Sequence, residues 1–536
     1  MQQNKANRRE FIAAASSLAL AARAGPAGAQ DGGAGQVNSR ELIGAALAGP
    51  DYALVNGSFI DHRGRVGDTL TVAGDRIAAI GFALELAPEL PVLDLGGRSA
   101  IPGLIDAHVH YTRAGINPGY QARRVERAFS LEELKQTIAE RAASVPAGEF
   151  ITCIGGWNHN QLAERRVPTA ADLDDAAPAH AVYLAATGGG TGAIANTRAA
   201  AIFAARGVEV ELATGRVGSS RDALAALTAA QTEADRLRGT AELNAHAASL
   251  GLTTVVNAGN LEDQTYPLAL WRSGRLDLRM RPLYPADSPD EVASRAANLF
   301  AQDGRAVGDE LYRPAGFGER IGGGNTMSEQ FEPTALAVAR AGWLLQQHSI
   351  SATENAFHLA VFERIARERP IADLHWALIH LQAISAEHLA ALGRLGAGAS
   401  AQTWTYLSAA GGPPFRRIVD SGIPAAVGTD STNVSALDPW LTLYYMITGR
   451  NLAGEPSNEG QQISRLEALK LYTDGAAWFC HEQDRLGAFE PGRLADLAVL
   501  SHDYLTVPED ALRRVEAQLT LVGGRVVHAA GPFGPV

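Results

Sequence analysis

Two histidines separated by one residue, His108 and His110, end an apolar run that begins at Ile101. On a β-strand, successive side chains alternate between the two faces, so both imidazoles would project to the same side. Neutral imidazole is a common ligand for zinc and similar ions. The pair therefore indicates half of a metal site at a strand end, with the carboxylate of Asp106 beside it. By itself, the pair is equally compatible with two incidental loop histidines.

Three more polar residues, His348, His380 and Asp430, each follow a short apolar run farther along the chain. Barrel enzymes carry their functional side chains at the carboxyl ends of the strands. A single histidine after a strand is more often a satisfied polar residue than a ligand. The ordered set of five, His-x-His followed by two histidines and an aspartate, favours ligands that converge on one centre.

The region around these residues alternates short apolar strands with helical stretches rich in alanine and leucine, which is typical of a parallel α/β fold. Candidate strands are 101–105, 182–185, 253–257, 278–283, 316–321, 343–348, 375–380, 397–402 and 425–429. Candidate helices are 130–143, 223–250, 333–341, 353–369, 386–395 and 464–477. Since more than eight strands result, one or two belong to an insertion at about residues 115–240. We therefore predict a (β/α)8 TIM barrel over residues 101–485.

Both flanks of the predicted barrel are rich in short strands. In residues 48–100, turns at Asn56-Gly57 and Gly74-Asp75 each join two strands, and together these strands predict a small antiparallel sheet. Matching strands in residues 486–536 turn at Gly523-Gly524. We expect the two halves to meet as one small β-sandwich beside the barrel.

The composition excludes several classes of protein. A chain of 536 residues is too long for one minimal domain, and 46% hydrophobic with 19% charged residues is enough to bury a large core. A net charge of −12 without a basic run argues against nucleic acid or an anionic membrane as a partner. The two cysteines, Cys153 and Cys480, exclude a disulfide framework and a cysteine-based zinc finger.

The first 30 residues have the features of an export signal. Arg8, Arg9 and Phe11 precede the alanine-rich run 13–22, and small residues follow, with cleavage expected near Ala29. This pattern resembles a twin-arginine signal, which predicts the twin-arginine export machinery as a partner and a periplasmic or extracellular protein. The apolar run is too short for a permanent membrane anchor. The alternative is a basic N-terminus without a targeting role.

Several stretches resemble the amidohydrolase superfamily, and more closely its amidohydrolase family 3 branch, which includes N-substituted formamide deformylase-like proteins. They are Pro102-Gly-Leu-Ile-Asp-Ala-His-Val-His110, Gly156-Trp-Asn-His-Asn160, Val167-Pro-Thr-Ala-Ala-Asp-Leu-Asp174, Ala476-Ala477 after Tyr472-Thr473, and 486–497. The resemblance covers nearly all of the chain after the predicted signal. It implies a metal-dependent hydrolase with a (β/α)8 barrel and a flanking β-sandwich.

By this resemblance, His108 and His110 would bind metal from the first barrel strand, His348 from the fifth and His380 from the sixth. Asp430, after the eighth, would bind metal and also act as the catalytic proton-transfer group. The metal would make hydroxide available for attack on a carbonyl and would stabilise the oxyanion. The implied cofactor is one or two divalent ions, with zinc the first candidate and iron, manganese and cobalt also suited to such ligands.

Members with two metals need a bridging ligand on the fourth strand, often a carboxylated lysine. The only lysines, Lys5, Lys135 and Lys470, lie in the predicted signal or in helical stretches. The substitute is Glu319, whose carboxylate can bridge two cations without modification. The alternative for Glu319 is a surface-loop acid paired with Arg320.

Trp157, Asn158 and His159 match a motif of the branch and are candidates for contact with the substrate. The alternative is structural, with Trp157 in packing and His159 in a loop hydrogen bond. Where the branch commonly has a Gly-His pair, this chain has the glycine-rich run 187–192, which suggests an altered specificity. The run is not followed by Lys-Ser/Thr, so it does not read as a phosphate loop.

The leading hypothesis is a metal-dependent hydrolase that cleaves a non-peptide carbon–nitrogen bond in a small amide, cyclic amide or N-acyl compound. One alternative is a deaminase of the same fold, which would share the metal ligands. Another is a catalytically silent periplasmic binding protein for a small molecule, which would have no need of a proton shuttle such as Asp430. Substrate, metal identity, metal number and oligomeric state stay open.

Overall fold

The computed structural model describes most of the chain, namely residues 49–187, 192–258, 264–299, 308–324, 326–407, 411–431 and 434–534. The predicted export signal, residues 1–30, lies outside the described residues, as does the middle of the glycine-rich run, 188–191. In the part of the chain that is described, every helix is too short or too polar to cross a membrane.

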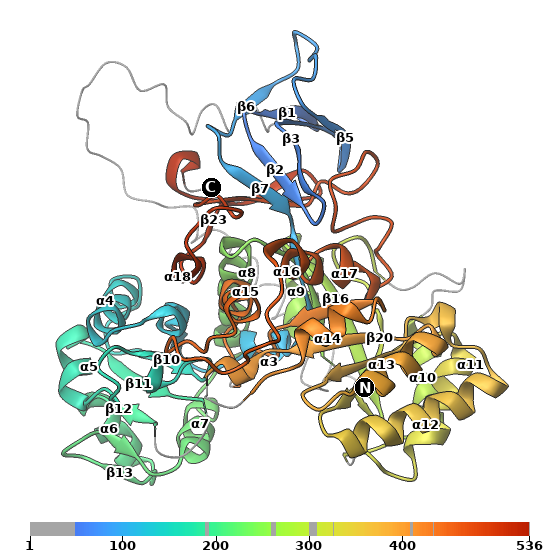
Figure 1. Ribbon diagram of the computed structural model, residues 1–536. Coiled ribbons are helices and arrows are strands. Elements are labelled where there is room, and N and C mark those ends of the chain that lie inside the picture. The colour runs from blue at the N-terminus through green and yellow to red at the C-terminus, as the bar shows by residue number, and fades with distance from the viewer. Residues whose placement is uncertain are drawn as a thin grey trace, which may run out of the picture.

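Two sheets at one end of the molecule form a β-sandwich to which both chain ends contribute (Figure 1). One sheet has the order β5-β4-β1-β6, with strands Arg76–Gly81, Thr69–Ala73, Asp51–Val55 and Val92–Asp94. The other has the order β24-β23-β22-β7-β2-β3, with strands Arg525–Ala529, Ala517–Val522, Leu497–Leu500, Ser99–Pro102, Ser58–Asp61 and Gly64–Gly67. Apolar side chains from both sheets make one buried cluster, including Leu54, Leu70, Leu497 and Leu519. The predicted sandwich of both chain ends is confirmed.

The turn at Asn56-Gly57 does not join a hairpin, contrary to the sequence prediction. β1 before it pairs with β4 and β6, whereas β2 after it pairs with β3 and β7, so the two strands lie in different sheets. A Cβ at Gly57 would lie 2.9 Å from Leu95 Cδ1, which shows how closely the chain passes the core as it changes sheets. Strand periodicity specifies which face is buried, but it does not specify the pairing partner.

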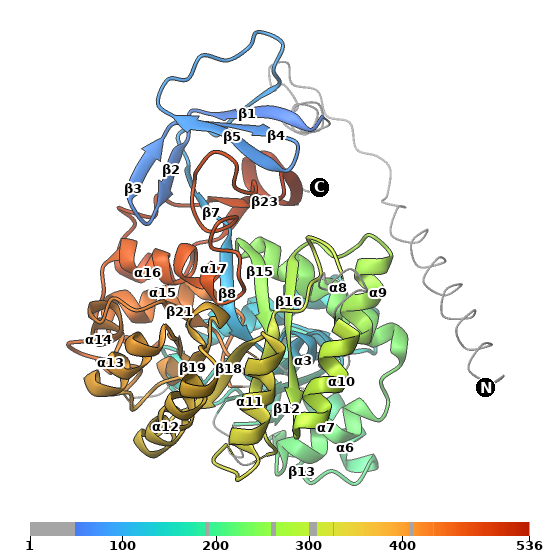
Figure 2. The same ribbon diagram turned by 90° about the vertical axis from the view of Figure 1, so that its right-hand side faces the viewer.

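Eight parallel strands form the nearly closed barrel in chain order, which confirms the predicted (β/α)8 fold (Figure 2). They are β8 (Leu104–Val109), β15 (Leu252–Asn257), β16 (Arg279–Ala286), β17 (Gly316–Ile321), β18 (Leu344–Ser349), β19 (Ala377–His380), β20 (Gly398–Gln402) and β21 (Ala425–Gly428). β8 and β21 meet at the closure, where Asp430 N–H donates to His108 O at 2.9 Å and His110 N–H to Ser431 O at 2.6 Å. A Cβ on Gly428 would lie 2.5 Å from His108 N, so only glycine permits this approach.

Helices cover the outside of the barrel. They are α3 (Tyr111–Gly115), α8 (Glu233–Ser249), α9 (Thr265–Arg272), α10 (Pro289–Leu299), α11 (Phe331–Ala341), α12 (Ala352–Glu368), α13 (Ala386–Leu395), α14 (Phe415–Asp420), α15 (Pro439–Thr448), α16 (Arg465–Leu471), α17 (Asp474–Trp478) and, near the sandwich, α18 (Glu509–Leu512). Two predicted helices are each split in the structure. The helix predicted at 223–250 breaks because Thr232 and Asp235 form a capping box that starts α8, and the one predicted at 464–477 becomes α16 and α17.

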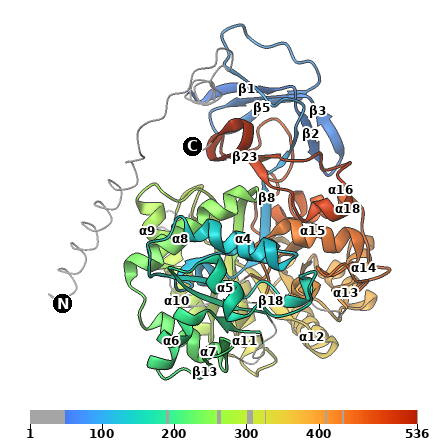
Figure 3. The same ribbon diagram turned by 90° about the vertical axis from the view of Figure 1, so that its left-hand side faces the viewer.

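A separate six-stranded sheet, between α3 and α8 in the sequence, lies beside the barrel in Figure 1 and in front of it in Figure 3. Its order is β13-β14-β12-β11-β10-β9, with strands Val210–Glu211, Arg216–Val217, Ile194–Ala195, Ala181–Ala185, Phe150–Ile154 and Tyr120–Gln121. Its helices are α4 (Leu131–Ala142), α5 (Ala170–Ala176), α6 (Thr197–Ala205) and α7 (Ser220–Thr228). The candidate strand 182–185 belongs to this sheet and not to the barrel.

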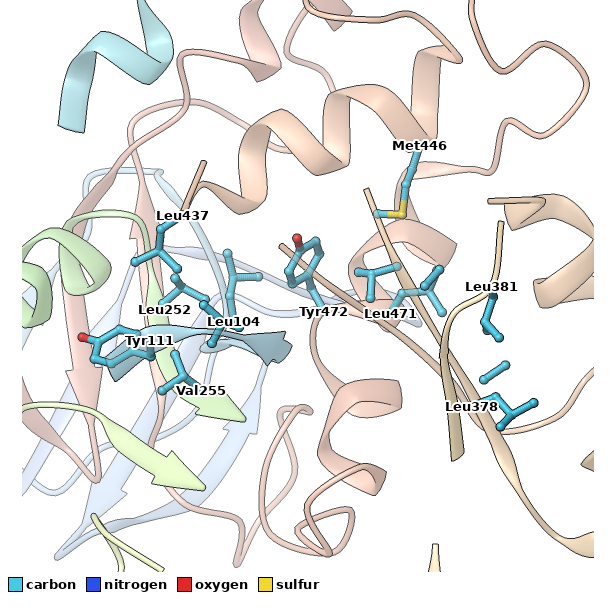
Figure 4. Packing of buried hydrophobic residues seen from close by; sticks show 14 of the residues in the cluster. Leu104, Tyr111, Leu252, Val255, Leu378, Leu381, Leu437, Met446, Leu471 and Tyr472 are labelled. Atoms are coloured by element: carbon cyan, nitrogen blue, oxygen red, sulfur yellow. The ribbon is translucent and has the colours of Figure 1, made fainter. Parts of the chain in front are cut away.

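The main core lies between the barrel strands and their helices (Figure 4). Leu104 of β8 lies beside Leu252 and Val255 of β15, with Tyr111 of α3 against them. Because this apolar shell surrounds the strands along their length, the strand ends are held in a rigid ring. Polar side chains placed at those ends are therefore fixed relative to one another.

Candidate metal centre

Four of the predicted ligands meet at the carboxyl end of the barrel. Nε2 of His108 lies 3.0 Å from Glu319 Oε2 and 3.4 Å from Asp430 Oδ1. Nε2 of His110 lies 3.5 Å and 3.3 Å from the same two oxygens. Two imidazoles and two carboxylates from the first, fourth and eighth strands thus surround a space of the size of one cation.

The remaining two predicted ligands, His348 and His380, come from the fifth and sixth strands and form a second group with Glu319. His348 Nδ1 lies 3.6 Å from Glu319 Oε1, and His380 Nε2 lies 4.0 Å from Glu319 Oε2. His380 also reaches the first group, since its Nδ1 lies 3.7 Å from Asp430 Oδ2. All six residues predicted from the sequence are therefore brought together.

Several polar atoms of this cluster are buried without a hydrogen-bond partner among the described residues. They include both ring nitrogens of His108 and of His380, His348 Nδ1 and Glu319 Oε2. A buried polar group without a partner is costly, so native proteins rarely keep one without a reason. Nitrogen and oxygen lone pairs that face one another at 3 to 4 Å fit a divalent cation bound at about 2 Å from each ligand atom. The donor set thus suits a metal ion.

Asp106, which comes two residues before His108, ties the first barrel strand to the last. Its Oδ1 accepts hydrogen bonds from the backbone N–H groups of His108 at 3.2 Å and Thr429 at 3.0 Å, and its Oδ2 accepts from Thr429 Oγ1 at 2.5 Å. Burial raises the pKa of Asp106 to about 6, against the lowering effect of these hydrogen bonds. The carboxylate positions the residues on either side of the closure without being a predicted ligand.

Gln402 is a positioning residue that the sequence interpretation missed. His380 and Leu381 have left-handed backbone φ values of 78° and 67°, which are uncommon outside glycine. The side-chain oxygen of Gln402 accepts a hydrogen bond from His380 N–H, and its Nε2 donates to Ser400 Oγ at 3.2 Å. The available signal was its position, because Gln402 ends the seventh barrel strand.

Electrostatics within the cluster follow from burial and from close opposite charges. Burial would lower the pKa of His108, but the carboxylates of Asp430 and Glu319, 3.4 and 3.0 Å from its Nε2, raise it to about 10. Burial would raise the pKa of Glu319, but His108 and His348 hold it well below its ordinary value. Burial lowers the pKa of His380 to about 3. The two carboxylates therefore attract a positive charge to the position between them, which is the place a cation would take.

The three weaker candidates, Trp157, Asn158 and His159, lie in the insertion. Trp157 is fully buried in the apolar cluster of that region. Asn158 caps the short 3-10 helix His159–Gln161, and its Nδ2 donates to Thr187 O at 3.2 Å. Within the described residues, none of the three is hydrogen bonded to any of the six predicted ligands. The packing role proposed for Trp157 has direct support, whereas substrate contact stays a prediction.

Comparison with known proteins shows the family of this chain. A family model described as the amidohydrolase family matches residues 91–528. The N-substituted formamide deformylase of Arthrobacter pascens is 22% identical over 536 residues, which cover 88% of this chain and 97% of that protein.

Solved structures share the fold. An uncharacterized metal-dependent hydrolase from Pyrococcus horikoshii OT3 superposes with a TM-score of 0.57 at 19% identity, covering 86% of this chain and 99% of the other. Atrazine chlorohydrolase TrzN from Arthrobacter aurescens TC1, complexed with zinc, superposes with a TM-score of 0.55 at 17% identity, covering 90% and 96%. Since the family model spans most of the chain, from the sandwich through the barrel, the protein belongs to the amidohydrolase family.

Proposed function

We propose that the protein is a metal-dependent hydrolase that cleaves a non-peptide carbon–nitrogen bond in a small amide, cyclic amide or N-acyl compound. Hydrolysis of carbon–nitrogen bonds in general follows from membership of the amidohydrolase family. The restriction to small, non-peptide substrates is the new part. The restriction to small substrates is supported by the burial of the centre, where His108 is fully buried and Glu319, His380 and Asp430 are each less than 10% exposed.

The observation that carries the proposal is the set of buried, unpartnered ligand atoms at the ends of the barrel strands. His108, His110, Glu319 and Asp430 would hold a divalent cation, with His380 within reach of the same position. We propose zinc as this cation, because imidazole and carboxylate ligands suit it. A cation held there would supply Lewis acidity, which lowers the pKa of water and polarises a carbonyl group.

Asp430 is the proposed catalytic residue. Its pKa lies below the ordinary value despite burial, because the nearby imidazoles of His108 and His110 stabilise the carboxylate. An ionised carboxylate can accept the proton of the attacking water and pass it to the leaving nitrogen. Its Oδ1 lies within 3.4 Å of both imidazoles, which hold it in position for this transfer.

We also propose that the protein is exported through the twin-arginine machinery, on the sequence pattern of residues 1–30. That machinery carries folded proteins, so a metal could be loaded before export. Cell fractionation of the full chain and of an Arg8→Lys, Arg9→Lys variant tests this. We expect the variant to stay in the cytoplasm, and equal distribution of the two would remove the proposal.

The test of the enzymatic proposal compares the wild-type protein with Asp430→Asn on a panel of N-substituted formamides, N-acyl compounds and cyclic amides. With excess Zn²⁺ present for both proteins, we expect turnover to fall about 10²–10⁴-fold, the usual effect of losing a general acid–base group. Asp373→Asn changes an exposed aspartate in the 3-10 helix Ala372–Leu374 and is the matched control.

Two outcomes would reject the proposal in favour of the alternatives. Release of ammonia from amino-substituted heterocycles, with no amide turnover, would indicate a deaminase. Tight binding of a panel compound by metal-loaded wild type without any turnover would indicate a small-molecule binding protein.

A further inference from the structure

The carboxylate of Glu319 turns its two oxygens toward different surroundings. Oε2 faces the first strand of the barrel, 3.0 Å from His108 Nε2 and 3.5 Å from His110 Nε2. Oε1 faces Arg320, whose Nε lies 3.4 Å away, and His348, whose Nδ1 lies 3.6 Å away. A carboxylate that bridges two cations has one of them on each oxygen. In this protein, a guanidinium already lies beside Oε1.

Arg320 lies on the solvent side of the cluster. Its side chain is 45% exposed, whereas those of Glu319 and His348 are 9% and 11% exposed. A guanidinium keeps its charge at every accessible pH and offers only hydrogen-bond donors. A permanent positive charge is therefore fixed at the edge of the second group of ligands.

The guanidinium of Arg320 also contacts His348. Arg320 Nη2 lies 3.4 Å from His348 Nε2, and a guanidinium can only donate hydrogen bonds. Arg320 thus lies beside two members of the second ligand group, Glu319 and His348, at the edge where a second cation would have to bind.

The charges of the cluster match a single divalent cation. Among the described residues of the two ligand groups, Glu319 and Asp430 are the only carboxylates, and together they balance a charge of +2. Because Arg320 already adds one positive charge, a second divalent ion would lack an anionic partner. Repulsion between unbalanced like charges at a few ångströms in a buried site is strong.

We propose that the centre holds one divalent cation, between His108, His110, Glu319 and Asp430, and that the guanidinium of Arg320 takes the place of a second one. Arg320 is thus a positioning residue that holds Glu319 Oε1 and sets the number of metal ions. The inference rests on the metal-dependent function proposed above and deepens it.

The test measures metal stoichiometry in the full-length protein. Protein stripped by a chelator is titrated with Zn²⁺ in a calorimeter, and the bound metal is then determined by elemental analysis. We expect one equivalent in the wild type and two in Arg320→Met, which keeps an apolar stem of similar length but removes the charge. Arg320→Lys retains a cation and should bind one equivalent.

Two controls keep the result interpretable. Arg340→Met changes an exposed arginine that pairs with Glu368, and it should bind one equivalent. Thermal melts show whether each variant is folded, and Arg320→Gln replaces Arg320→Met if the latter is not. Electron paramagnetic resonance with Mn²⁺ gives a second readout, an isolated-ion spectrum in the wild type and an exchange-coupled one in Arg320→Met.

Two equivalents in the wild type, or one in both Arg320→Met and Arg320→Gln, would overturn the inference, as would failure of the wild type to bind metal. The test also distinguishes failure of this inference from failure of the proposed function. A wild type that binds one ion and hydrolyses nothing would leave the inference standing and reject the hydrolase. A wild type that binds two ions and hydrolyses an amide would do the reverse.

Discussion

Two clusters of buried charged residues lie at opposite ends of the barrel, and they differ in how their polar atoms are satisfied. At the amino end of β16, Arg279 binds Asp496 through two hydrogen bonds of 2.7 and 2.8 Å. Arg281 lies 2.7 Å from Glu482, which also binds Arg313 and, at 3.3 Å, Arg485. Among the described residues, no buried side-chain nitrogen or oxygen of this cluster lacks a hydrogen-bond partner. We call it the arginine network.

The metal centre at the carboxyl ends of the same strands is equally buried, yet several of its ligand atoms have no partner. The arginine network completes its own hydrogen bonding, so it needs nothing further to be stable. The metal centre is complete only when a cation is added. The difference teaches that burial of charged residues does not by itself mark a functional site. A cluster of several ionisable side chains buried without partners is the stronger indication.

The largest loss of stability is expected from breaking the arginine network. Glu482→Gln removes the charge that faces Arg281 and leaves a fully buried guanidinium uncompensated. Loss of one partner of a buried ion pair costs about 3–5 kcal/mol. Chemical denaturation should show this loss in the free energy of unfolding, while the content of bound divalent metal stays that of the wild type. Glu368→Gln, which breaks an exposed pair with Arg340, is the control and should cost little.

A smaller loss of stability is expected from a substitution at the point where the barrel closes. Gly428→Ala would put a Cβ 2.5 Å from His108 N and 2.6 Å from His108 O. Overpacking of this kind costs about 1–3 kcal/mol. Because His108 moves with its backbone, zinc affinity should fall as well, which distinguishes this variant from Glu482→Gln. Gly49→Ala meets open space and serves as the control. Unchanged zinc affinity in Gly428→Ala would show that β8 can shift without disturbing the centre.

The pH dependence of stability sharpens the comparison. Burial would raise the pKa of Glu482, but Arg281, Arg313 and Arg485 lower it below its ordinary value of 4.5. A group whose pKa is lowered by folding stabilises the native state at pH values above its unfolded-state pKa. This stabilisation is lost as the pH falls through the folded-state pKa of the group. Unfolding experiments from pH 7 down to pH 3 should therefore show that the stability difference between wild type and Glu482→Gln shrinks below about pH 4.5. A difference that is constant over this range would contradict the assignment.

The smallest change in the stability of the metal-free protein is expected from a substitution at the metal centre. His380 is buried and neutral, its pKa is lowered by burial to about 3, and neither ring nitrogen has a hydrogen-bond partner among the described residues. His380→Leu removes two unsatisfied atoms, so the free energy of unfolding without metal should be unchanged or rise by about 1 kcal/mol. The zinc-induced rise in melting temperature should shrink. A marked loss of stability in the metal-free variant would show that His380 supports the fold by itself.

Local pattern was sufficient to predict most of the barrel. The strands that carry His108, His348 and His380 were recognised because each is a short apolar run that ends in a polar side chain. Glu319 was proposed differently, through the family resemblance, as the substitute for a bridging lysine. The sequence did not show that β1 and β2 separate at Asn56-Gly57, because strand pairing depends on contacts with distant segments such as Leu95. The positioning role of Gln402 was also missed, since a glutamine at a strand end has many possible partners.

The amino-acid sequence alone determined which ligands are available and in what order the barrel strands deliver them, because alternation along a strand and the shared direction of parallel strands are local rules. Only the tertiary structure decided how those ligands face one another. It turned one oxygen of Glu319 toward His108 and the other toward Arg320. Distances between strands are set by packing across the whole barrel, and no run of residues encodes them.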